Sequence, residues 1–544
     1  MKHCFLHLII LLFTINPKGH GQSLNMRELI QLEAEANREY QNLNFHEALP
    51  LYLKLDSIQA HNPNYLFPIG VSYVFFNEAQ KAIPFLEACI DKKEISTASL
   101  DYYLARAYHL NAQFDKSIES YTKYKDFFAS KKSKRHQALF DDIDQQIAYC
   151  NNGKDLYCKP VNVKIANLGP FINSQYPEYA PVISGDEREI ILTSSKPNTT
   201  GGQRDYASDG HYFEDVYIST HNGQKWEEIS SIGDSINTND HDASVALSSD
   251  GKNLITYRYS EANILSAGSG DLYLSTYSNF NWTKAQKLPF CEKDHWESSA
   301  TFSKDASQII YSSNKEGGQG GSDLYSIYRN SNGAWSIPVS LGTAINTKFD
   351  EDAPFLAPDG KTLYFCSKGH KSMGGYDVFV SHLSDETLMW SVPENIGYPL
   401  NTPHDDVHYS WSADGKRVYF SAIRPEGYGD RDIYVGEFIV ETKDTVSSFF
   451  TLLTASVTDA ISQSMLAATL KIYELDADGS TTSNIKEYDF SLDIKSKSIE
   501  LMKGKKYLMV VESKGYKAYT ENIDLSVPEN TNIEKLFSMY KEEE

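Results

Sequence analysis

The sequence APDGKTLYFCSKGHKSMGGYDVFV, Ala357 to Val380, decides the fold of the largest part of this 544-residue chain. It joins an Asp-Gly turn, an apolar strand, a glycine-rich turn and an Asp-Val-Phe triplet. Such Asp-X-aromatic triplets recur at intervals of 56, 52, 54 and 55 residues and begin at Asp215, Asp271, Asp323, Asp377 and Asp432. Each interval accommodates about four short strands with their turns. The chain therefore repeats one antiparallel unit five times.

Repetition at this period is typical of a β-propeller, in which each unit forms one four-stranded blade. We predict a five-bladed β-propeller over residues 159–441. The phrase ANLGPFINS, Ala166 to Ser174, matches the phrases that end other blades but stands before the first full unit. The strand around residues 163–168 is therefore expected to be the outer strand of the fifth blade and to close the ring.

Two further features accompany the repeat. The glycines of GGQGG, Gly317 to Gly321, are expected to form tight turns with positive φ, because no helix follows them with the Lys that a phosphate-binding loop requires. Four tryptophans follow the triplets by 11 to 13 residues and are predicted to be equivalent core positions: Trp226, Trp282, Trp335 and Trp390.

Residues 22–151 are predicted to form an α-helical solenoid, since apolar residues recur there at three- and four-residue spacing. The phrases FHEALPLY, AQKAIPFL and FDKSIESY place Ala48, Ala82 and Ser117 at intervals of 34 and 35 residues. This pattern resembles the tetratricopeptide repeat, in which small residues let the two helices of a hairpin pack closely. Three hairpins and a capping helix are expected.

Residues 444–540 alternate again but lack the propeller phrase, and a small antiparallel β-sandwich is predicted. The order of strands resembles the carboxypeptidase regulatory-like, transthyretin-like domain. The resemblance depends mainly on GKKYLMVVESKGYKAY, Gly504 to Tyr519.

The propeller units resemble the TolB-like repeat, and Ala357 to Val380 is the best copy. The order of the predicted domains is similar to that of the OmpA-family envelope proteins of Bacteroidetes, among them the PorE-like component of the type IX secretion system. This resemblance implies envelope or secretion-system proteins as partners. Such proteins commonly end in a peptidoglycan-binding OmpA-type domain, which has no counterpart here, so peptidoglycan anchoring is not expected.

The composition predicts a globular protein, with 41% hydrophobic residues and a formal net charge of -22. This acidity disfavours nucleic acid as a partner, because only a short basic run at 131–135 opposes it. Lys2, an apolar run from Cys4 to Ile15 and small residues before Gln22 predict a signal peptide over residues 1–21. No lipobox cysteine follows that run. A periplasmic protein with peripheral rather than integral association with the outer membrane is therefore expected.

Five cysteines follow residue 21, and only Cys150 and Cys158 are close in sequence. An oxidising compartment permits a disulfide between these two, and the alternative is a pair of free thiols at the end of a helix. The odd number leaves at least one thiol unpaired within the chain.

No catalytic motif is evident, and the protein is predicted not to be an enzyme. The sequence lacks a Gly-X-Ser-X-Gly elbow. His241, His295, His404 and His408 lack the spacing of metal ligands and are interpreted as isolated surface or turn residues. No metal or cofactor is predicted.

One acid per blade stands eight residues before the Asp-Gly turn or its equivalent: Glu178, Asp242, Glu297, Glu351 and Asp406. Its presence in every blade favours a structural role, such as accepting backbone N–H bonds from a neighbouring blade. The alternative is a ring of acids that holds a cation or a basic peptide, because clustered like charges attract counter-charge.

Two functions follow from these observations. The first is a non-enzymatic scaffold or adaptor of the cell envelope, and the second is a glycan-binding or glycan-processing propeller protein. One equivalent acid per blade favours the first. Its candidate binding groove lies on the first helix of each hairpin and comprises Tyr40, Asn44, Tyr73, Asn77, Tyr108 and Asn111.

Overall fold

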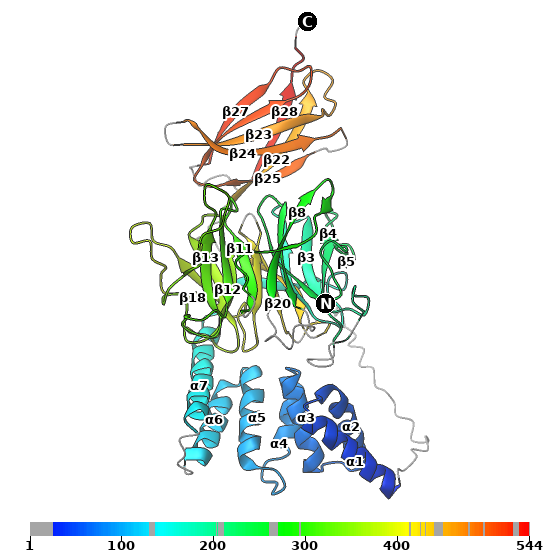
Figure 1. The fold of residues 1–544 in the computed structure, drawn as a ribbon. Helices are drawn as coiled ribbons and strands as arrows, with labels where there is room; N and C mark the ends of the chain where they lie inside the picture. Colours follow the sequence, from blue (N-terminus) through cyan, green and yellow to red (C-terminus); the bar gives the residue numbers. More distant parts are fainter. Residues whose placement is uncertain are drawn as a thin grey trace, which may run out of the picture. The chain divides into compact units, whose positions relative to one another are not determined.

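The computed structural model describes residues 25–129, 136–202, 204, 211–259, 270–292, 295–412, 415–424, 426–429, 431–439, 450–476, 479–492, 496–525 and 532–542. The predicted signal peptide and the basic run at 131–135 lie outside these residues. The chain has a multidomain layout, with helices first and antiparallel sheets after them (Figure 1). It divides into two compact units, residues 1–107 and 108–544. None of the described helices is long and apolar enough to cross a membrane.

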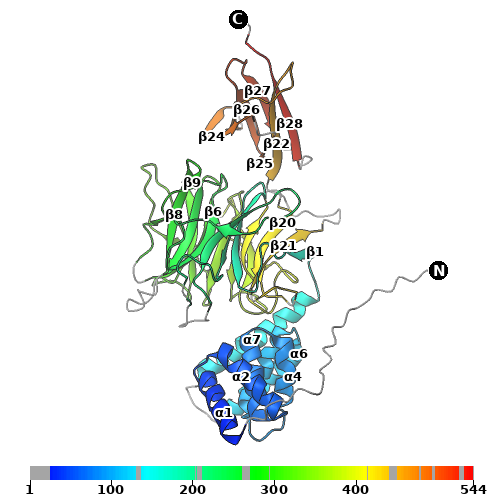
Figure 2. The ribbon, with the colours of Figure 1, turned by 90° about the vertical axis from the view of Figure 1, so that its right-hand side faces the viewer.

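The described N-terminal residues form seven helices (Figure 2). Within them α1 packs against α2, α3 against α4, and α6 against α7. The helices are α1 (Met26–Gln41), α2 (Phe45–Ile58), α3 (Pro63–Phe75), α4 (Ala79–Glu87), α5 (Thr97–Leu110), α6 (Phe114–Ala129) and α7 (Gln137–Tyr157).

Small side chains let these helices approach closely, as the sequence predicts. Ala48, Ala82 and Ser117 are all fully buried. A Cβ atom added to Gly70 in α3 would lie 2.6 Å from Cγ of Leu86 in α4, so any larger residue at 70 would push the two helices apart. The 34-residue period therefore marks the helix contacts.

Residues 163–438 form five sheets, which we number in chain order. The first is β2 (Glu178–Ile183), β3 (Glu189–Ser194), β4 (Asp215–Thr220) and β5 (Ser230–Ser231); the second is β6 (His241–Leu247), β7 (Asn253–Tyr259), β8 (Asp271–Ser278) and β10 (Gln286–Lys287), with β9 (Asn281–Trp282) on β8. The third is β11 (Glu297–Phe302), β12 (Gln308–Ser313), β13 (Asp323–Tyr328) and β14 (Val339–Ser340); the fourth is β15 (Glu351–Leu356), β16 (Thr362–Ser367), β17 (Asp377–His382) and β18 (Glu394–Asn395). The fifth is β19 (Val407–Trp411), β20 (Arg417–Ala422), β21 (Asp432–Phe438) and β1 (Val163–Asn167).

The first strands of the five sheets follow one another in space. In order β2, β6, β11, β15 and β19, each strand lies against the next, and β19 lies against β2. The fourth strand of the fifth sheet is β1, which pairs antiparallel with β21 from Val163 opposite Phe438 to Asn167 opposite Tyr434. A strand from before the first sheet thus completes the last one, which is the pairing expected from the sequence.

The four repeated tryptophans occupy equivalent places, but they are not equally buried. Each pairs with the residue at or just beyond the end of the third strand of its sheet, as Trp226 does with His221 and Trp390 with Leu383. Trp226 is buried with 9% exposure, whereas the other three are half-buried at the edges of the core. Trp226 therefore belongs to the core, as predicted, whereas the other three cover its sides.

The C-terminal residues form two sheets around one apolar core. One consists of β25 (Lys497–Met502), β22 (Phe450–Asp459) and β28 (Asn532–Met539), and the other of β24 (Thr481–Phe490), β23 (Ala468–Leu475), β26 (Lys506–Glu512) and β27 (Tyr519–Asp524). The pair β22 and β28 is parallel, so the prediction of a wholly antiparallel sandwich is wrong at this pair. Parallel neighbours need a long connection, and here the whole domain lies between the two strands.

Helix α7 belongs to the same compact unit as the sheets and contacts the fourth of them. The Tyr149 hydroxyl donates to the Lys368 carbonyl at 2.5 Å, and Asn152 Nδ2 donates to the Ser372 carbonyl at 2.8 Å. The ring of Tyr157 stacks on that of Tyr398, with centroids 3.9 Å apart. These contacts position the start of β1, which follows the helix.

The disulfide considered between Cys150 and Cys158 is not formed, and both thiols are free. Cys150 lies within α7 and Cys158 directly follows it. At a rise of 1.5 Å per residue, about 12 Å of helix separates them, whereas a disulfide needs Cα atoms within about 7 Å of each other. The Cys150 thiol is buried and donates to the Ser117 hydroxyl at 3.3 Å.

Candidate functional site

The repeated phrases form the junctions between successive sheets. Four junctions contain an asparagine whose side-chain amide hydrogen-bonds to the backbone of the third strand of the preceding sheet: Asn173, Asn237, Asn346 and Asn401. In the junction of the third and fourth sheets, Asn346 Oδ1 accepts from the Leu324 N–H at 2.8 Å and Nδ2 donates to the Leu324 carbonyl at 3.0 Å. Both residues are buried. The Leu324 carbonyl also accepts from the Leu341 N–H at 3.0 Å, so the amide serves as the partner of the Leu324 N–H and as a second donor to the carbonyl.

The repeated acids are buried at these junctions, with exposures of 2% or less. Glu351 accepts from the N–H and the hydroxyl of Thr347, both at 2.7 Å, and from Ser367 Oγ at 2.7 Å. Ser174 or a threonine in the same place makes equivalent bonds to Glu178, Asp242 and Asp406. The donors to these four acids lie in the turn before the strand, and a serine at the end of the second strand of the same sheet adds a bond to Glu178 and Glu351. This corrects the expectation of donors in a neighbouring blade. Glu297 accepts from such a serine, Ser313.

Four triplet aspartates, Asp215, Asp323, Asp377 and Asp432, also accept backbone N–H groups from the loops before them. Asp323 Oδ2 receives Gln319 N–H at 2.8 Å and Gly320 N–H at 3.3 Å. A Cβ atom on Gly318 would lie 1.8 Å from Asp323 Oδ2, and one on Gly320 would lie 2.0 Å from a carbonyl oxygen. Close approach therefore requires these glycines, and positive φ, which the sequence predicted, occurs only at Gly317 among the four.

Burial raises the pKa of the paired carboxyl groups at the junctions. It raises the pKa of Glu178, Glu297, Glu351 and Asp406 to about 7 and that of Asp215 to about 6. The hydrogen bonds at most of these acids act in the opposite direction, because they stabilise the charged form. Because these carboxyl groups are buried, they do not form a ring of exposed negative charge.

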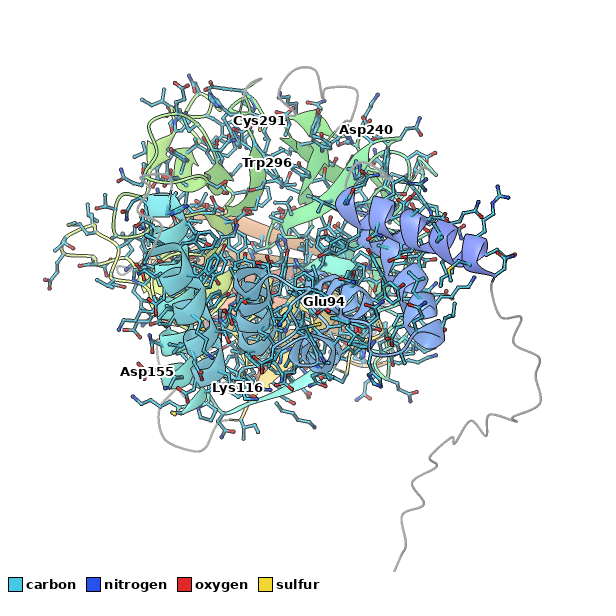
Figure 3. The ribbon with its side chains drawn as sticks, turned by 90° about the horizontal axis from the view of Figure 1, so that it is seen from below. Glu94, Lys116, Asp155, Asp240, Cys291 and Trp296 are labelled. Carbon is cyan, nitrogen blue, oxygen red and sulfur yellow. The ribbon has the colours of Figure 1, made fainter. Side chains whose placement is uncertain are left out.

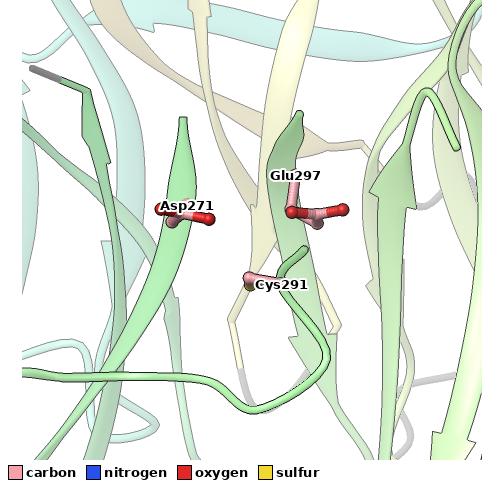
Figure 4. A group of neighbouring side chains, drawn as sticks. All are labelled: Asp271, Cys291 and Glu297. Atoms are coloured by element: carbon pink, nitrogen blue, oxygen red, sulfur yellow. The ribbon is translucent and has the colours of Figure 1, made fainter. Parts of the chain in front are cut away.

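The junction of the second and third sheets differs from the other four. Cys291 stands in the place of the asparagine and contacts the backbone of Leu272, with its Sγ 3.4 Å from the Leu272 N–H nitrogen. Figure 4 shows Asp271 and Glu297 at the ends of neighbouring strands, with Cys291 on the loop between them. One donor atom from each of these three residues lies within 4.8 Å of the other two.

Sequence reasoning missed this group. The sequence pattern indicates Asp271 only as the first residue of a triplet and Glu297 only as one of the five repeated acids. Cys291 is one of the five cysteines after residue 21, and no pattern connects it with either acid. The signal was present in KLPFCEKDHWE, Lys287 to Glu297, where the Gly-X-X-X-Asn phrase of the other junctions is replaced. Cys291 and the half-exposed Trp296 are both labelled on the sheets in Figure 3.

A cavity of about 130 Å³ lies where the first strands of the five sheets meet, with room for several water molecules. All five sheets contribute to its lining, through residues such as Ala180, Ser244, Ser299, Ala353 and His408. Among the described residues, the charged side chains of the lining are Lys304 and one carboxylate, Glu500 of β25. Paired carboxylates for glycoside hydrolysis are therefore not among these residues.

Other potential catalytic groups are already engaged or buried. The Ser299 hydroxyl donates to Asp352 and accepts from the Ala353 N–H at 2.9 Å, so no imidazole activates it. His404 lies in the bend before β19, as the interpretation of turn residues has it, whereas His408 lies within β19. Both are half-buried, and burial lowers the pKa of each to about 4.

The tyrosines of the candidate groove pack within the helical hairpins. Tyr40 contacts the edges of Phe45 and Tyr52, and Tyr73 stacks on Phe85 with centroids 5.8 Å apart. Tyr108 is buried, and Lys116, labelled in Figure 3, lies over its ring at 4.9 Å. Asn44, Asn77 and Asn111 lie in the turns that follow the first helices. Binding by these six residues stays a prediction.

Comparisons with known proteins give weak structural neighbours only. No protein-family model matches the chain, and no curated protein matches it. The match to a putative TolB from Agrobacterium tumefaciens covers 51% of this chain and 98% of the TolB chain, with 16% identity and a TM-score of 0.28. The match to the Sgt2 TPR domain of Aspergillus fumigatus covers 25% of this chain and 89% of that domain, with 21% identity and a TM-score of 0.20. An endo-1,4-beta-xylanase of Bacteroides thetaiotaomicron covers 51% and 96%, with 14% identity and a TM-score of 0.32. Scores this low support no conclusion about activity.

Proposed function

We propose that this protein is a non-enzymatic scaffold of the cell envelope that binds other proteins. In this proposal residues 22–151 are a tetratricopeptide solenoid, residues 159–441 a five-bladed TolB-like propeller, and residues 444–540 a carboxypeptidase regulatory-like domain. Solenoids and propellers are built by repetition and present extended surfaces, which suits binding more than chemistry.

One observation carries this proposal: the repeated carboxylates are buried and hydrogen-bonded to the turns that connect the sheets. Glu178, Asp242, Glu351 and Asp406 are buried and accept hydrogen bonds from the preceding turn. A substrate would have to displace these bonds to reach them. The acids therefore support a structural repeat, and the outer surfaces remain for partners.

The charge and the resemblance found in the sequence suggest the kind of partner. A formal net charge of -22 favours proteins with basic patches, and such association weakens as salt screens it. An envelope or secretion assembly, reached through the predicted signal peptide and periplasmic location, is the proposed setting. Membrane association is proposed to be peripheral.

The experiment is capture of envelope proteins on the immobilised full chain at low and high salt. Asn44→Arg with Asn111→Arg places two cations at the proposed groove, and Asn281→Arg with Asn332→Arg is the matched control at exposed positions in β9 and in a turn. Loss of the same partners in the first variant, and not in the second, is expected. Equal capture by both variants would refute the groove, and turnover of a glycan or peptide by the purified chain would refute the scaffold.

A further inference from the structure

We propose that Asp271, Cys291 and Glu297 form a binding site for a zinc-like divalent metal ion at the junction of the second and third sheets. The three donors come from β8, the connecting loop and β11, and they face one gap (Figure 4). They lie within 4.8 Å of one another, and a small inward movement would place all three at coordination distance.

An unpartnered buried oxygen points to a missing ligand. Glu297 is 2% exposed, and its Oε1 accepts from Ser313 Oγ at 2.9 Å. Its Oε2 is buried and, among the described residues, has no hydrogen-bond partner. The equivalent oxygens of Glu351 are both satisfied by Thr347 and Ser367. Asp406 Oδ1 is also buried without a partner among the described residues, but its junction has an amide in place of the thiol, so the thiol beside the open oxygen distinguishes this site. A buried carboxylate oxygen without a donor is costly unless a cation or a water completes it.

The donor set selects the kind of ion. Calcium and magnesium prefer all-oxygen sites, whereas zinc combines a cysteine sulfur with carboxylate oxygens and takes four ligands. Three protein ligands leave a fourth position for water. A divalent ion with one thiolate and two carboxylates has a net charge of -1, and the Lys287 ammonium, 2.7 Å from Asp271 Oδ1, balances it.

The surroundings also suit a metal thiolate. The Leu272 N–H points at Cys291 Sγ from 3.4 Å, and a backbone donor of this kind stabilises a ligated sulfur. Asp271 can bind the ion through one oxygen and keep Lys287 on the other. The remaining junctions have an amide in place of the thiol, so the proposal concerns this junction alone.

Cobalt(II) is the probe, because a cobalt–thiolate bond gives a charge-transfer absorption band that zinc removes. The purified full chain, stripped with a chelator, is expected to bind one cobalt ion with this band. Cys291→Asn copies the amide of the other junctions and should fold without the band. Glu297→Gln should weaken zinc binding by about 100-fold or more, since even outer-shell changes cost roughly 10–100-fold. Cys158→Ser, at the exposed thiol, is the control and should keep the band.

A second measurement is independent of the variants. Because the Cys291 thiol is buried, alkylation is carried out in urea near the unfolding midpoint. In the unsubstituted chain, zinc is expected to slow alkylation of Cys291 and to leave that of Cys158 unchanged, as read by peptide mass spectrometry. Absence of the band in the full chain, its persistence in Cys291→Asn, or equal alkylation of Cys291 with and without zinc would each overturn the proposal.

Discussion

Replacement of Asn346 by alanine tests the account of the sheet junctions most directly. The change removes the acceptor of the Leu324 N–H and the donor to the Leu324 carbonyl, and both residues are buried. The Leu324 carbonyl keeps its bond from the Leu341 N–H at 3.0 Å, so only the Leu324 N–H is left unsatisfied. One such buried group should lower the free energy of unfolding by about 1–3 kcal/mol. The third bond, to Ser340 Oγ, adds little because that serine is exposed and water replaces the amide.

Tryptophan fluorescence during urea unfolding isolates this effect, since all six tryptophans lie between residues 226 and 411 and report on the five sheets alone. Asn332→Ala is the matched control, because Asn332 makes one hydrogen bond in an exposed turn and its loss should change the free energy of unfolding by less than about 0.5 kcal/mol. Asn346→Asp should cost at least as much as alanine, because it turns a carboxylate oxygen toward the Leu324 carbonyl. Equal unfolding midpoints for Asn346→Ala and Asn332→Ala would refute the reasoning.

Three further predictions concern the same sheets. Trp226→Ala should lower the free energy of unfolding by about 3–5 kcal/mol and Trp390→Ala by less, because only Trp226 is buried; calorimetry measures both, and equal losses would contradict the burial argument. Burial raises the pKa of Glu351 from 4.5 to about 7, so the folded state keeps a proton that the unfolded state loses, and stability should fall as pH rises through this window. Glu351→Gln should flatten that dependence by about 3 kcal/mol between pH 4.5 and 7, and an unchanged slope of stability against pH would contradict the assignment. Ile165→Pro should disrupt the pairing of β1 with β21, expose an edge and cause aggregation on light scattering, whereas an unaltered thermal transition would argue against closure by β1.

Much of the architecture could be predicted from the sequence because it is encoded locally. Asp-Gly turns, alternating strands and the triplets each depend on neighbouring residues, so five copies reveal five units without knowledge of their packing. The pairing of β1 with β21 was also readable, because the phrase that ends other units stands before the first one. The 34-residue spacing likewise located Ala48, Ala82 and Ser117, which the structure buries in the helix contacts.

Other features depend on residues that are distant in sequence and meet only when the chain is packed. The parallel pairing of β22 with β28 and the engaged state of the groove tyrosines depend on such contacts. So does the meeting of Asp271, Cys291 and Glu297, since one strand, one loop and the next sheet bring their donors together. A local pattern specifies which element forms, whereas the burial of a charge or thiol, and hence its chemistry, is decided by the neighbours that tertiary packing supplies.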